Sequence, residues 1–186
     1  MEYKAHDYPE IYESLGIDLK TLGCVMLKTE QPDTSFIDDE DLYVSSDPAK
    51  FWIKGRAAGN SHVTLRYGLL PVVRQEHVRR ILDDVYLPRN LFVSSVEMFE
   101  SPYSDEPYEC IVARVDSAGK SGMLQEANIA LSLLPNVSTF SEYKSHVTLA
   151  YVKKGWWRQN SSSEAEFIDS VGMLRTKGLN FGGMLP

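Results

Sequence analysis

The sequence predicts an α+β fold in which helices and strands are mixed along one chain. Apolar residues recur at helical spacing in two stretches, residues 75–86 and 123–134, while other runs have the length and alternation of strands. No low-complexity linker divides the 186 residues, and this length suffices for one good-sized core or two closely packed lobes. We therefore expect a single domain that spans residues 1–186.

Several apolar or alternating segments are typical of strands, because turn-forming residues separate them. These expected strands are residues 23–28, 61–67, 91–99, 108–115, 145–152 and a last one near 179–181. The acidic and Ser/Pro-rich stretch 30–49 is expected to be a loop with a short extended piece at residues 42–44, and residues 51–53 are expected to form another edge strand.

Proline and glycine mark the ends of the expected helices. A short first helix begins after Pro9 and ends at Gly16, and Pro88 and Pro135 follow the helices at 75–86 and 123–134. The polar stretch 159–163 near the end of the chain is expected to be a loop.

The charge balance favours a small anionic ligand over a long nucleic acid. The chain carries 26 acidic and 19 basic residues, for a net charge of −7. A protein that grips many phosphates of a long strand usually presents a basic face, because the release of counterions drives that binding. We expect a small nucleotide as the partner and no contact with a membrane, since no apolar run reaches spanning length.

Both cysteines lie in apolar runs, which predicts burial as small hydrophobic side chains. Cys24 and Cys110 form no CxxC pair or Cys/His cluster, so a reducing compartment fits best. The N-terminal residues lack the apolar segment of a signal peptide, and we expect a cytoplasmic protein.

The most informative feature is an exact repeat of five residues. Ser61–Leu65 and Ser145–Leu149 both read Ser-His-Val-Thr-Leu, and a tyrosine follows two positions later in each copy, Tyr67 and Tyr151. Such self-similarity indicates an internal duplication. Because side chains alternate in a strand, His and Thr of each copy are expected to share one face, with Val, Leu and Tyr on the opposite face.

Two such strands near a pseudo-two-fold axis bring two imidazoles and two hydroxyls to one point. Threonine hydroxyls donate hydrogen bonds to phosphate oxygens, and the histidines serve proton transfer from opposite sides. The sequence thus predicts His62, Thr64, His146 and Thr148 as a catalytic set. Zinc is the competing interpretation for paired histidines, but neither HExxH nor CxxC accompanies them, so we expect no metal and no cofactor.

The two His-x-Thr motifs resemble the signature of the 2H phosphoesterase superfamily, which includes RNA 2′,3′-cyclic phosphodiesterases of the LigT type. The resemblance implies a bilobed, pseudo-two-fold α+β fold with the active site in the cleft between the lobes. It also implies that the four motif residues are catalytic. The acidic chain and its long 30–60 insertion look more like bacteriophage anti-CBASS phosphodiesterases, which destroy cyclic oligonucleotide signals.

Five side chains are candidates for substrate contacts. Arg66 is expected on the motif face if the strand continues, and the loop of Trp156 and Trp157 is expected to overhang the cleft, where aromatic rings stack on bases. Tyr12 is a weaker aromatic candidate, as is Trp52.

Three functions remain open from the sequence. The first is a metal-independent phosphodiesterase that hydrolyses cyclic di- or trinucleotides, as a means of evading CBASS antiviral defence. The second is a 2′,3′-cyclic phosphodiesterase that acts on RNA ends, and the third is a nucleotide-binding module without activity. The third is disfavoured because binding alone does not need paired imidazoles.

Overall fold

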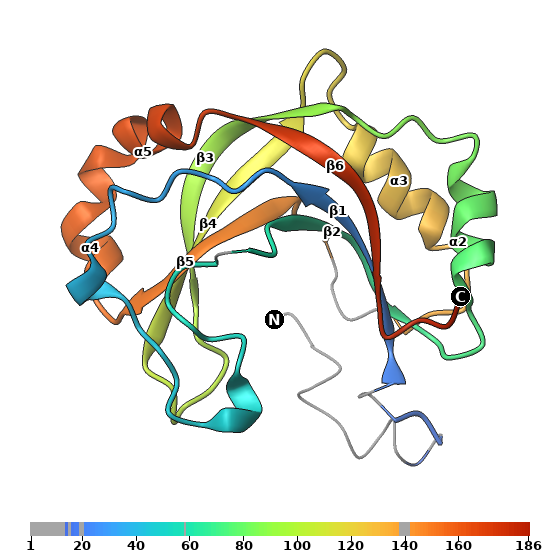
Figure 1. Cartoon of the computed structure of the whole chain (residues 1–186), viewed down its shortest axis with the longest axis horizontal. Coiled ribbons are helices and arrows are strands. Elements are labelled where there is room, and N and C mark those ends of the chain that lie inside the picture. The colour runs from blue at the N-terminus through green and yellow to red at the C-terminus, as the bar shows by residue number, and fades with distance from the viewer. Residues whose placement is uncertain (1–13, 15, 19–20, 58, 138–141) are drawn as a thin grey trace.

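The computed structural model describes residues 14, 16–18, 21–57, 59–137 and 142–186. Six antiparallel strands and four α-helices make up most of this part (Figure 1). The strands are β1 Gly23–Thr29, β2 His62–Leu69, β3 Asn90–Glu100, β4 Tyr108–Ser117, β5 His146–Lys153 and β6 Met173–Gly182. The helices are α2 Gln75–Leu82, α3 Met123–Leu131, α4 Trp156–Asn160 and α5 Glu164–Val171, with 3₁₀ turns η3 Asp39–Asp41, η4 Pro48–Lys50 and η5 Ser161–Ser163.

The α+β class is confirmed, and the tail is where the expectation fails. The expected loop at 159–163 lies within α4 and η5, and α5 follows it. Serine-rich residues disfavour helix by themselves, but Phe167 and Val171 are buried one helical turn apart, and this packing overrides local preference. The short extended piece expected at 42–44 is present as isolated bridges, from Leu42 to Val152 and from Val44 to Lys54. The edge strand expected at 51–53 is wrong, since a turn follows η4 there. The expected helix between Pro9 and Gly16 lies largely outside the described residues.

The strands follow the order β1-β2-β5-β4-β3-β6, and β6 pairs with β1 to close the ring. This order contains two equivalent halves, β6-β1-β2 and β3-β4-β5, joined where Val63 pairs with Val147. In the first half Cys24, Met26 and Lys28 pair with Tyr67, Thr64 and His62. In the second half Cys110, Val112 and Arg114 pair with Tyr151, Thr148 and His146. The bilobed, pseudo-two-fold arrangement expected from the repeat is therefore confirmed.

Each half also contains the same irregularity. The pairing of β1 with β2 shifts between Val25 and Met26, and the pairing of β4 with β5 shifts between Ile111 and Val112. Leu65 and Leu149 are the residues left without a partner, as in a β-bulge. Beyond a bulge, the alternation of side chains between the two faces of the strand is reversed. The side chains that follow each motif therefore lie on the face opposite the one that simple alternation predicts.

The buried residues form one core against which the helices pack. Val63, Leu65, Val147 and Leu149 are all fully buried in it. Helix α3 lies against β2, where the Asn128 side chain donates a hydrogen bond to the Leu65 carbonyl at 2.6 Å. Figure 1 shows the strands as an arch, with α2 and α3 toward one end and α4 and α5 toward the other.

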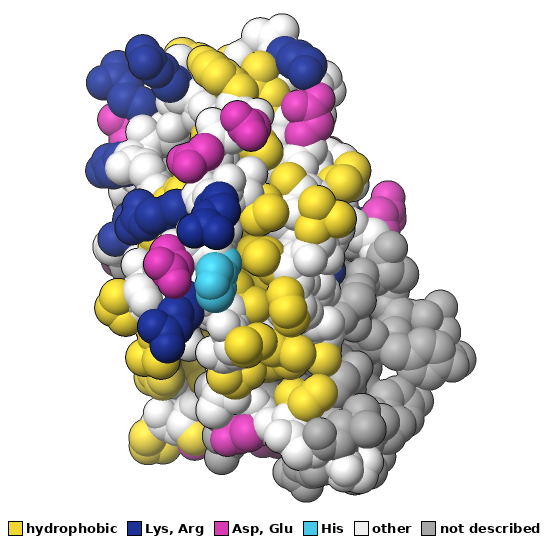
Figure 2. Space-filling model, turned by 90° about the vertical axis from the view of Figure 1, so that its right-hand side faces the viewer, with side chains coloured by type: hydrophobic (Ala, Val, Ile, Leu, Met, Phe, Trp, Pro, Cys, Tyr) yellow, Lys and Arg dark blue, Asp and Glu magenta, His cyan; other side chains and the backbone are white. Residues whose placement is uncertain are grey.

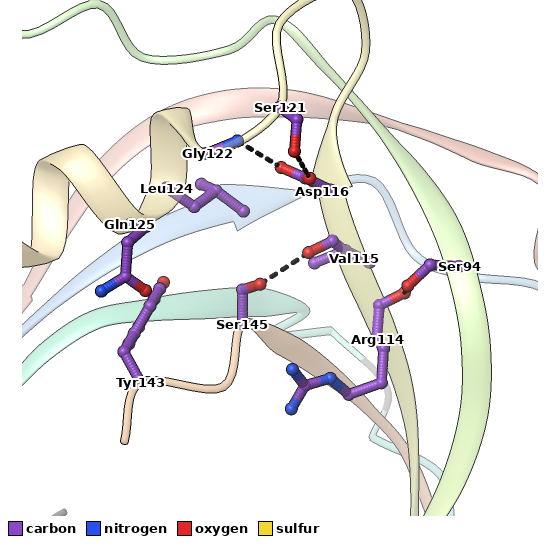
Figure 3. A pocket seen from close by; sticks show the side chains of 10 residues that line it. All are labelled: Ser94, Arg114, Val115, Asp116, Ser121, Gly122, Leu124, Gln125, Tyr143 and Ser145. Carbon is purple, nitrogen blue, oxygen red and sulfur yellow. Dashed lines mark hydrogen bonds between the residues drawn. The ribbon is translucent and has the colours of Figure 1, made fainter. Parts of the chain in front are cut away.

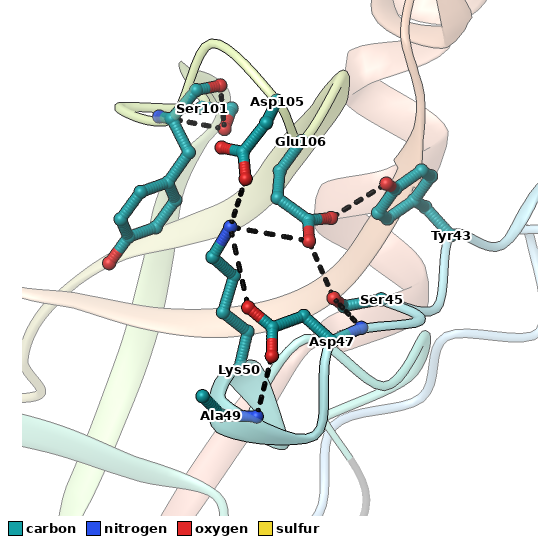
Figure 4. A network of polar contacts seen from close by, with 9 residues as sticks. Tyr43, Ser45, Asp47, Ala49, Lys50, Ser101, Asp105 and Glu106 are labelled. Carbon is teal, nitrogen blue, oxygen red and sulfur yellow. Dashed lines mark hydrogen bonds and ion pairs between the residues drawn. The ribbon is translucent and has the colours of Figure 1, made fainter.

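Residues 36–57, which we call the arm, run alongside β5 and the β3–β4 hairpin. Bridges join Leu42 to Val152 and Arg56 to Ala150, so the arm borders β5 beyond its motif. Glu106 fixes the arm to the hairpin, because its buried carboxylate accepts hydrogen bonds from Tyr43 Oη and Ser45 Oγ, both at 2.6 Å (Figure 4). Lys50 adds an ion pair to Asp105 at 2.7 Å. Among the described helices, none is long and apolar enough to span a membrane.

Candidate active site

The two copies of the pentapeptide form equivalent strands with the same backbone attachment at their start. The serine backbone carbonyls accept hydrogen bonds from Thr29 N and Val115 N, which fixes the start of each motif strand to its neighbour. The serine hydroxyls are also bound, to Thr29 Oγ1 and to the Val115 carbonyl. Because each residue has a packing or pairing role, a five-residue identity is understandable in structural terms.

One face of the motif strands, which we call the site face, is opposite the buried valines and leucines. It carries His62, Thr64, His146 and Thr148. All four are half-buried. The antiparallel pairing of Val63 with Val147 places His62 next to Thr148 and Thr64 next to His146. The structure therefore brings together the four side chains that the repeat singled out, and their catalytic role stays a prediction.

Both imidazoles are held by the same backbone contact. His62 Nδ1 lies 2.7 Å from the Asn60 carbonyl, and His146 Nδ1 lies 2.7 Å from the Lys144 carbonyl. A carbonyl oxygen only accepts, so each Nδ1 carries the proton and donates it. In the neutral ring this leaves the lone pair on Nε2, which is the nitrogen free for proton transfer.

The pKa of His146 is lowered from its ordinary value, mainly by burial. The positive charges of Arg114 and of His62 lower it further, while the Lys144 carbonyl and Glu97 act in the opposite direction. The ring of Phe99 packs edge-on against the imidazole, with 5.1 Å between ring centroids. His146 is thus favoured in its neutral form.

The two cysteines lie beside the motif threonines. Burial raises the pKa of Cys24 to about 11 and that of Cys110 to about 12, and hydrogen bonds with Thr64 and Thr148, respectively, partly oppose this. Both thiols therefore stay protonated near neutral pH and are poor nucleophiles. This agrees with the expectation of inert, largely buried cysteines.

The bulge moves the side chains that follow each motif. Beyond it Arg66 pairs with the buried Val25, so it lies on the core face and not beside His62, as expected from simple alternation. Its guanidinium donates to Asn136 Oδ1 there. Tyr67 and Tyr151 pair with Cys24 and Cys110 and so lie on the site face. The expectation that they lie on the opposite face with the valines and leucines is wrong, because the bulge reverses the alternation of side chains before them.

The tryptophan pair lies in and against the core. Trp156 is 5% exposed, stacks on Phe167 and donates from Nε1 to Asp41 Oδ2 at 3.0 Å, so its ring leaves no open face for a base. Trp157 is half-buried against the same core, and its backbone N–H donates to Glu109. Tyr12 lies outside the described residues.

Two further cations lie on the site face and were not among the expected contacts. Lys28 is paired directly with His62, and Arg114 is paired directly with His146. Both come from neighbouring strands, so no motif in the sequence connects them with the histidines. Within the described ranges, no group of three or more His, Cys, Asp or Glu residues is placed to hold a metal ion.

The sequence matches no protein-family model and no curated protein. Two solved structures of Usb1 from Kluyveromyces marxianus are similar to this chain, and one of them contains uridine monophosphate. Each is 12% identical, and each similarity covers 88% of this chain and 94% of the other, with TM-scores of 0.48 and 0.47.

Proposed function

We propose that this protein is a metal-independent phosphodiesterase that hydrolyses cyclic oligonucleotides. The observation that carries the proposal is the paired presentation of His62 and His146, each with Nδ1 bound to the carbonyl two residues earlier. Two imidazoles that both present Nε2 beside a threonine hydroxyl suit a reaction needing one base and one acid. A binding site for an anion has no need of this arrangement.

In the proposed mechanism His146 is the base. Its lowered pKa favours the neutral ring, whose Nε2 takes a proton from the attacking oxygen. A bond forms from that oxygen to phosphorus, and the bond from phosphorus to the leaving 5′-oxygen breaks. His62 Nε2 then gives a proton to the leaving oxygen, while Thr64 and Thr148 donate hydrogen bonds to the charge that develops on the phosphoryl oxygens.

The choice of a small cyclic substrate rests on charge and on the arm. With a net charge of −7 the chain lacks the overall basic character that favours long nucleic acids. Figure 2 shows one face, over α2 and the C terminus, on which basic side chains are interspersed with acidic and hydrophobic ones. The arm is bonded to β5 beyond Thr148 and so limits how far a substrate extends in that direction.

Because the chain resembles bacteriophage anti-CBASS phosphodiesterases, we also propose that its substrates are the cyclic oligonucleotide signals of CBASS antiviral defence. A 2′,3′-cyclic phosphodiesterase acting on RNA ends uses the same chemistry and is the alternative. A panel of cyclic dinucleotides, cyclic trinucleotides and 2′,3′-cyclic mononucleotides, scored by chromatography, separates the two. Turnover of the 2′,3′-cyclic mononucleotides alone would decide for the alternative.

The catalytic set is tested by substitution. His62→Ala and His146→Ala should each lower kcat by about 10²–10⁴-fold, the usual loss for one general acid or base. Thr64→Ala and Thr148→Ala should lose less, because each removes one of several hydrogen bonds. His77→Ala, a change on α2, is the matched control.

Circular dichroism and thermal melting check that each variant keeps the fold. Near-normal turnover by either catalytic histidine variant contradicts the mechanism. The same assays are run with a chelator, which should leave the rate unchanged. Activity that is lost in chelator and restored by zinc or manganese contradicts metal independence.

A further inference from the structure

A tyrosine lies at each end of the row of motif side chains on the site face. Tyr67 follows Thr64 along β2, and Thr64 lies next to His146 of the antiparallel strand β5. We call this the His146 end of the row. The equivalent tyrosine, Tyr151, follows the other motif threonine along β5 and stands at the opposite end, which we call the His62 end.

The distance from each tyrosine to its motif threonine matches the length of one nucleoside. On β1, the residues paired with Thr64 and Tyr67 are two positions apart, which is about 7 Å along a strand. The same spacing recurs on β4 for the residues paired with Thr148 and Tyr151. Both tyrosines are half-buried, so part of each ring is accessible to a ligand, and aromatic rings stack on nucleobases.

Further tyrosines surround the two rings. Tyr151 makes an edge contact with the buried Tyr108, with 5.2 Å between ring centroids, and Tyr108 in turn packs against Tyr43 of the arm. Burial is the main cause that raises the pKa of Tyr67 and of Tyr151, and the phenol of Tyr103 in the β3–β4 turn contributes to both shifts, so it lies near both rings. A ring that its neighbours already hold in place loses little conformational entropy when a base stacks on it.

The cavity of about 240 Å³ beside Arg114 does not extend this row (Figure 3). Its lining includes Val115 and Ser145, which alternate with Arg114 and His146 and so lie on the opposite face of their strands. The carboxylate of Asp116 also lines it, and a carboxylate repels the phosphates of a nucleotide. The nucleosides on either side of a scissile phosphate are therefore expected on the site face.

We propose that Tyr67 and Tyr151 stack on the bases of the two nucleosides that flank the scissile phosphate, and that they set the direction in which the substrate binds. The inference rests on the proposed function, in which His146 takes a proton from the attacking oxygen and His62 gives one to the leaving 5′-oxygen. The attacking and leaving oxygens lie on opposite sides of phosphorus. The nucleoside linked through its 5′-oxygen therefore lies on Tyr151, at the His62 end, and the nucleoside linked through its 3′-oxygen lies on Tyr67.

This arrangement narrows the substrate class. A substrate that uses both rings carries a base on each side of the scissile phosphate. Cyclic di- and trinucleotides satisfy this requirement, whereas 2′,3′-cyclic mononucleotides have a base on one side only.

The test measures the binding of three linear dinucleotides by calorimetry: ApA and two analogues, each of which lacks one of the two bases and keeps its ribose. The His62→Ala protein is used, so that turnover does not interfere. Tyr67→Ala, added to this protein, should weaken ApA about tenfold, as expected for the loss of one stacked base. It should weaken the analogue that keeps only the base of the 3′-linked nucleoside equally, and it should leave the other analogue unchanged. Tyr151→Ala should give the opposite pattern.

Control variants separate stacking from effects on the fold. Tyr67→Phe and Tyr151→Phe keep the ring and should change each affinity by less than about twofold. Tyr86→Ala removes an exposed tyrosine between α2 and β3 and should leave all three affinities unchanged. Thermal melting shows whether the alanine variants fold. If they do not, Tyr67→Leu and Tyr151→Leu, which fill part of the same space without an aromatic ring, take their place.

Affinities that do not change in either tyrosine variant, including no measurable binding of ApA, overturn the inference. So does a loss that is independent of which base is present, a pattern reversed between the two tyrosines, or an equal loss in the Phe variants. The proposed function fails in a different way. If it is wrong, the protein with both histidines intact leaves cyclic di- and trinucleotides uncleaved, while the base dependence measured in the His62→Ala protein stands.

Discussion

Phe99 covers one side of the His146 imidazole, and the equivalent position of the other half has no side chain. Phe99 pairs with Cys110, whereas the matching cysteine, Cys24, pairs with Gly182. The ring of Phe99 keeps water from the imidazole and so contributes to the burial that lowers the pKa of His146. In the proposed mechanism, the division of base and acid roles between two chemically identical histidines thus depends on a residue outside both motifs.

This arrangement predicts the low-pH limb of the rate profile. A base must be neutral to accept a proton. Because the pKa of His146 is lowered from its ordinary value of 6.5, the imidazole stays neutral to a lower pH than an ordinary histidine. The fall of kcat/KM on the acid side should therefore lie below pH 6.5. Phe99→Ala admits water to the imidazole, which raises its pKa and should move the limb to higher pH. Phe92→Ala, at an exposed position of the same strand, should leave the limb in place.

The measurement is kcat/KM as a function of pH for the wild type and both variants. An unmoved limb in Phe99→Ala would mean that the base is not His146 or that Phe99 does not shield it. A limb that moves equally in Phe92→Ala would point to a general effect on the fold.

The positions of the motif residues were predictable because their spacing matches strand geometry. The positions of the charged side chains around them were not predictable. Val63 and Val147 are buried and both histidines lie on the opposite face, as alternation requires. Arg66 was misplaced because a bulge at Leu65 reverses the alternation, and no residue type in the sequence marks that bulge. Arg114 could not be found because cross-strand pairing is a property of the folded chain.

At the scale of the elements, the attachment of the arm to the β3–β4 hairpin depends on one carboxylate. Glu106 lies in the turn between β3 and β4, and it accepts hydrogen bonds from Tyr43 and Ser45 on the arm. Those hydrogen bonds, that of Ser45 first, lower the pKa of Glu106. A group whose pKa is lowered in the folded state stabilises it at higher pH and loses this effect as pH falls. The attachment of the arm should therefore be present at neutral pH and weaken below the ordinary value of 4.5.

Hydrogen exchange measured by mass spectrometry tests this attachment. At pH 7 Glu106→Gln should accelerate exchange of the amides in residues 36–57, and it should leave β1 and β6 protected. After correction for the intrinsic rate, the wild type should show the same local acceleration when the pH is lowered below 4.5. Asp105→Asn, which removes only the exposed partner of Lys50, is the control and should have a smaller effect. Equal exchange of the arm in Glu106→Gln and wild type contradicts the prediction.

The elements of the tail show why local sequence was insufficient there. Glu109 on β4 accepts hydrogen bonds from the backbone N–H groups of Gly155 and Trp157, and so satisfies the start of α4 from a distant strand. Trp156 is then directed into the core beside Phe167. A search for local capping residues does not detect a cap supplied by another strand, and the tryptophan pair was therefore predicted as an exposed loop.

At the scale of the whole molecule, the two halves supply equal sets of the proposed catalytic groups within unequal surroundings. The half with β5 carries Phe99 and the cavity next to Arg114, and the half with β2 carries the exposed Lys28. A symmetric site treats the two sides of a phosphodiester alike, whereas cleavage needs a base on one side and an acid on the other. The differences between the halves provide that direction in the proposed mechanism.

The last prediction concerns the attacking oxygen. Paired imidazoles without a metal have no strong means of producing hydroxide at neutral pH, because the pKa of water is far from theirs. A ribose 2′-hydroxyl is already held next to its own 3′-phosphate, so the substrate itself supplies the proximity. For a 3′–5′ linked cyclic oligonucleotide we therefore expect ring opening through a 2′,3′-cyclic phosphate, which the two histidines then hydrolyse with their proton roles reversed.

Replacing the 2′-hydroxyl by hydrogen should preserve binding and stop cleavage of that bond. The measurement compares turnover of ribo- and 2′-deoxy cyclic dinucleotides, with binding followed by calorimetry. Cleavage of the deoxy compound at a similar rate would identify water as the nucleophile and leave the roles of the two histidines to be assigned anew.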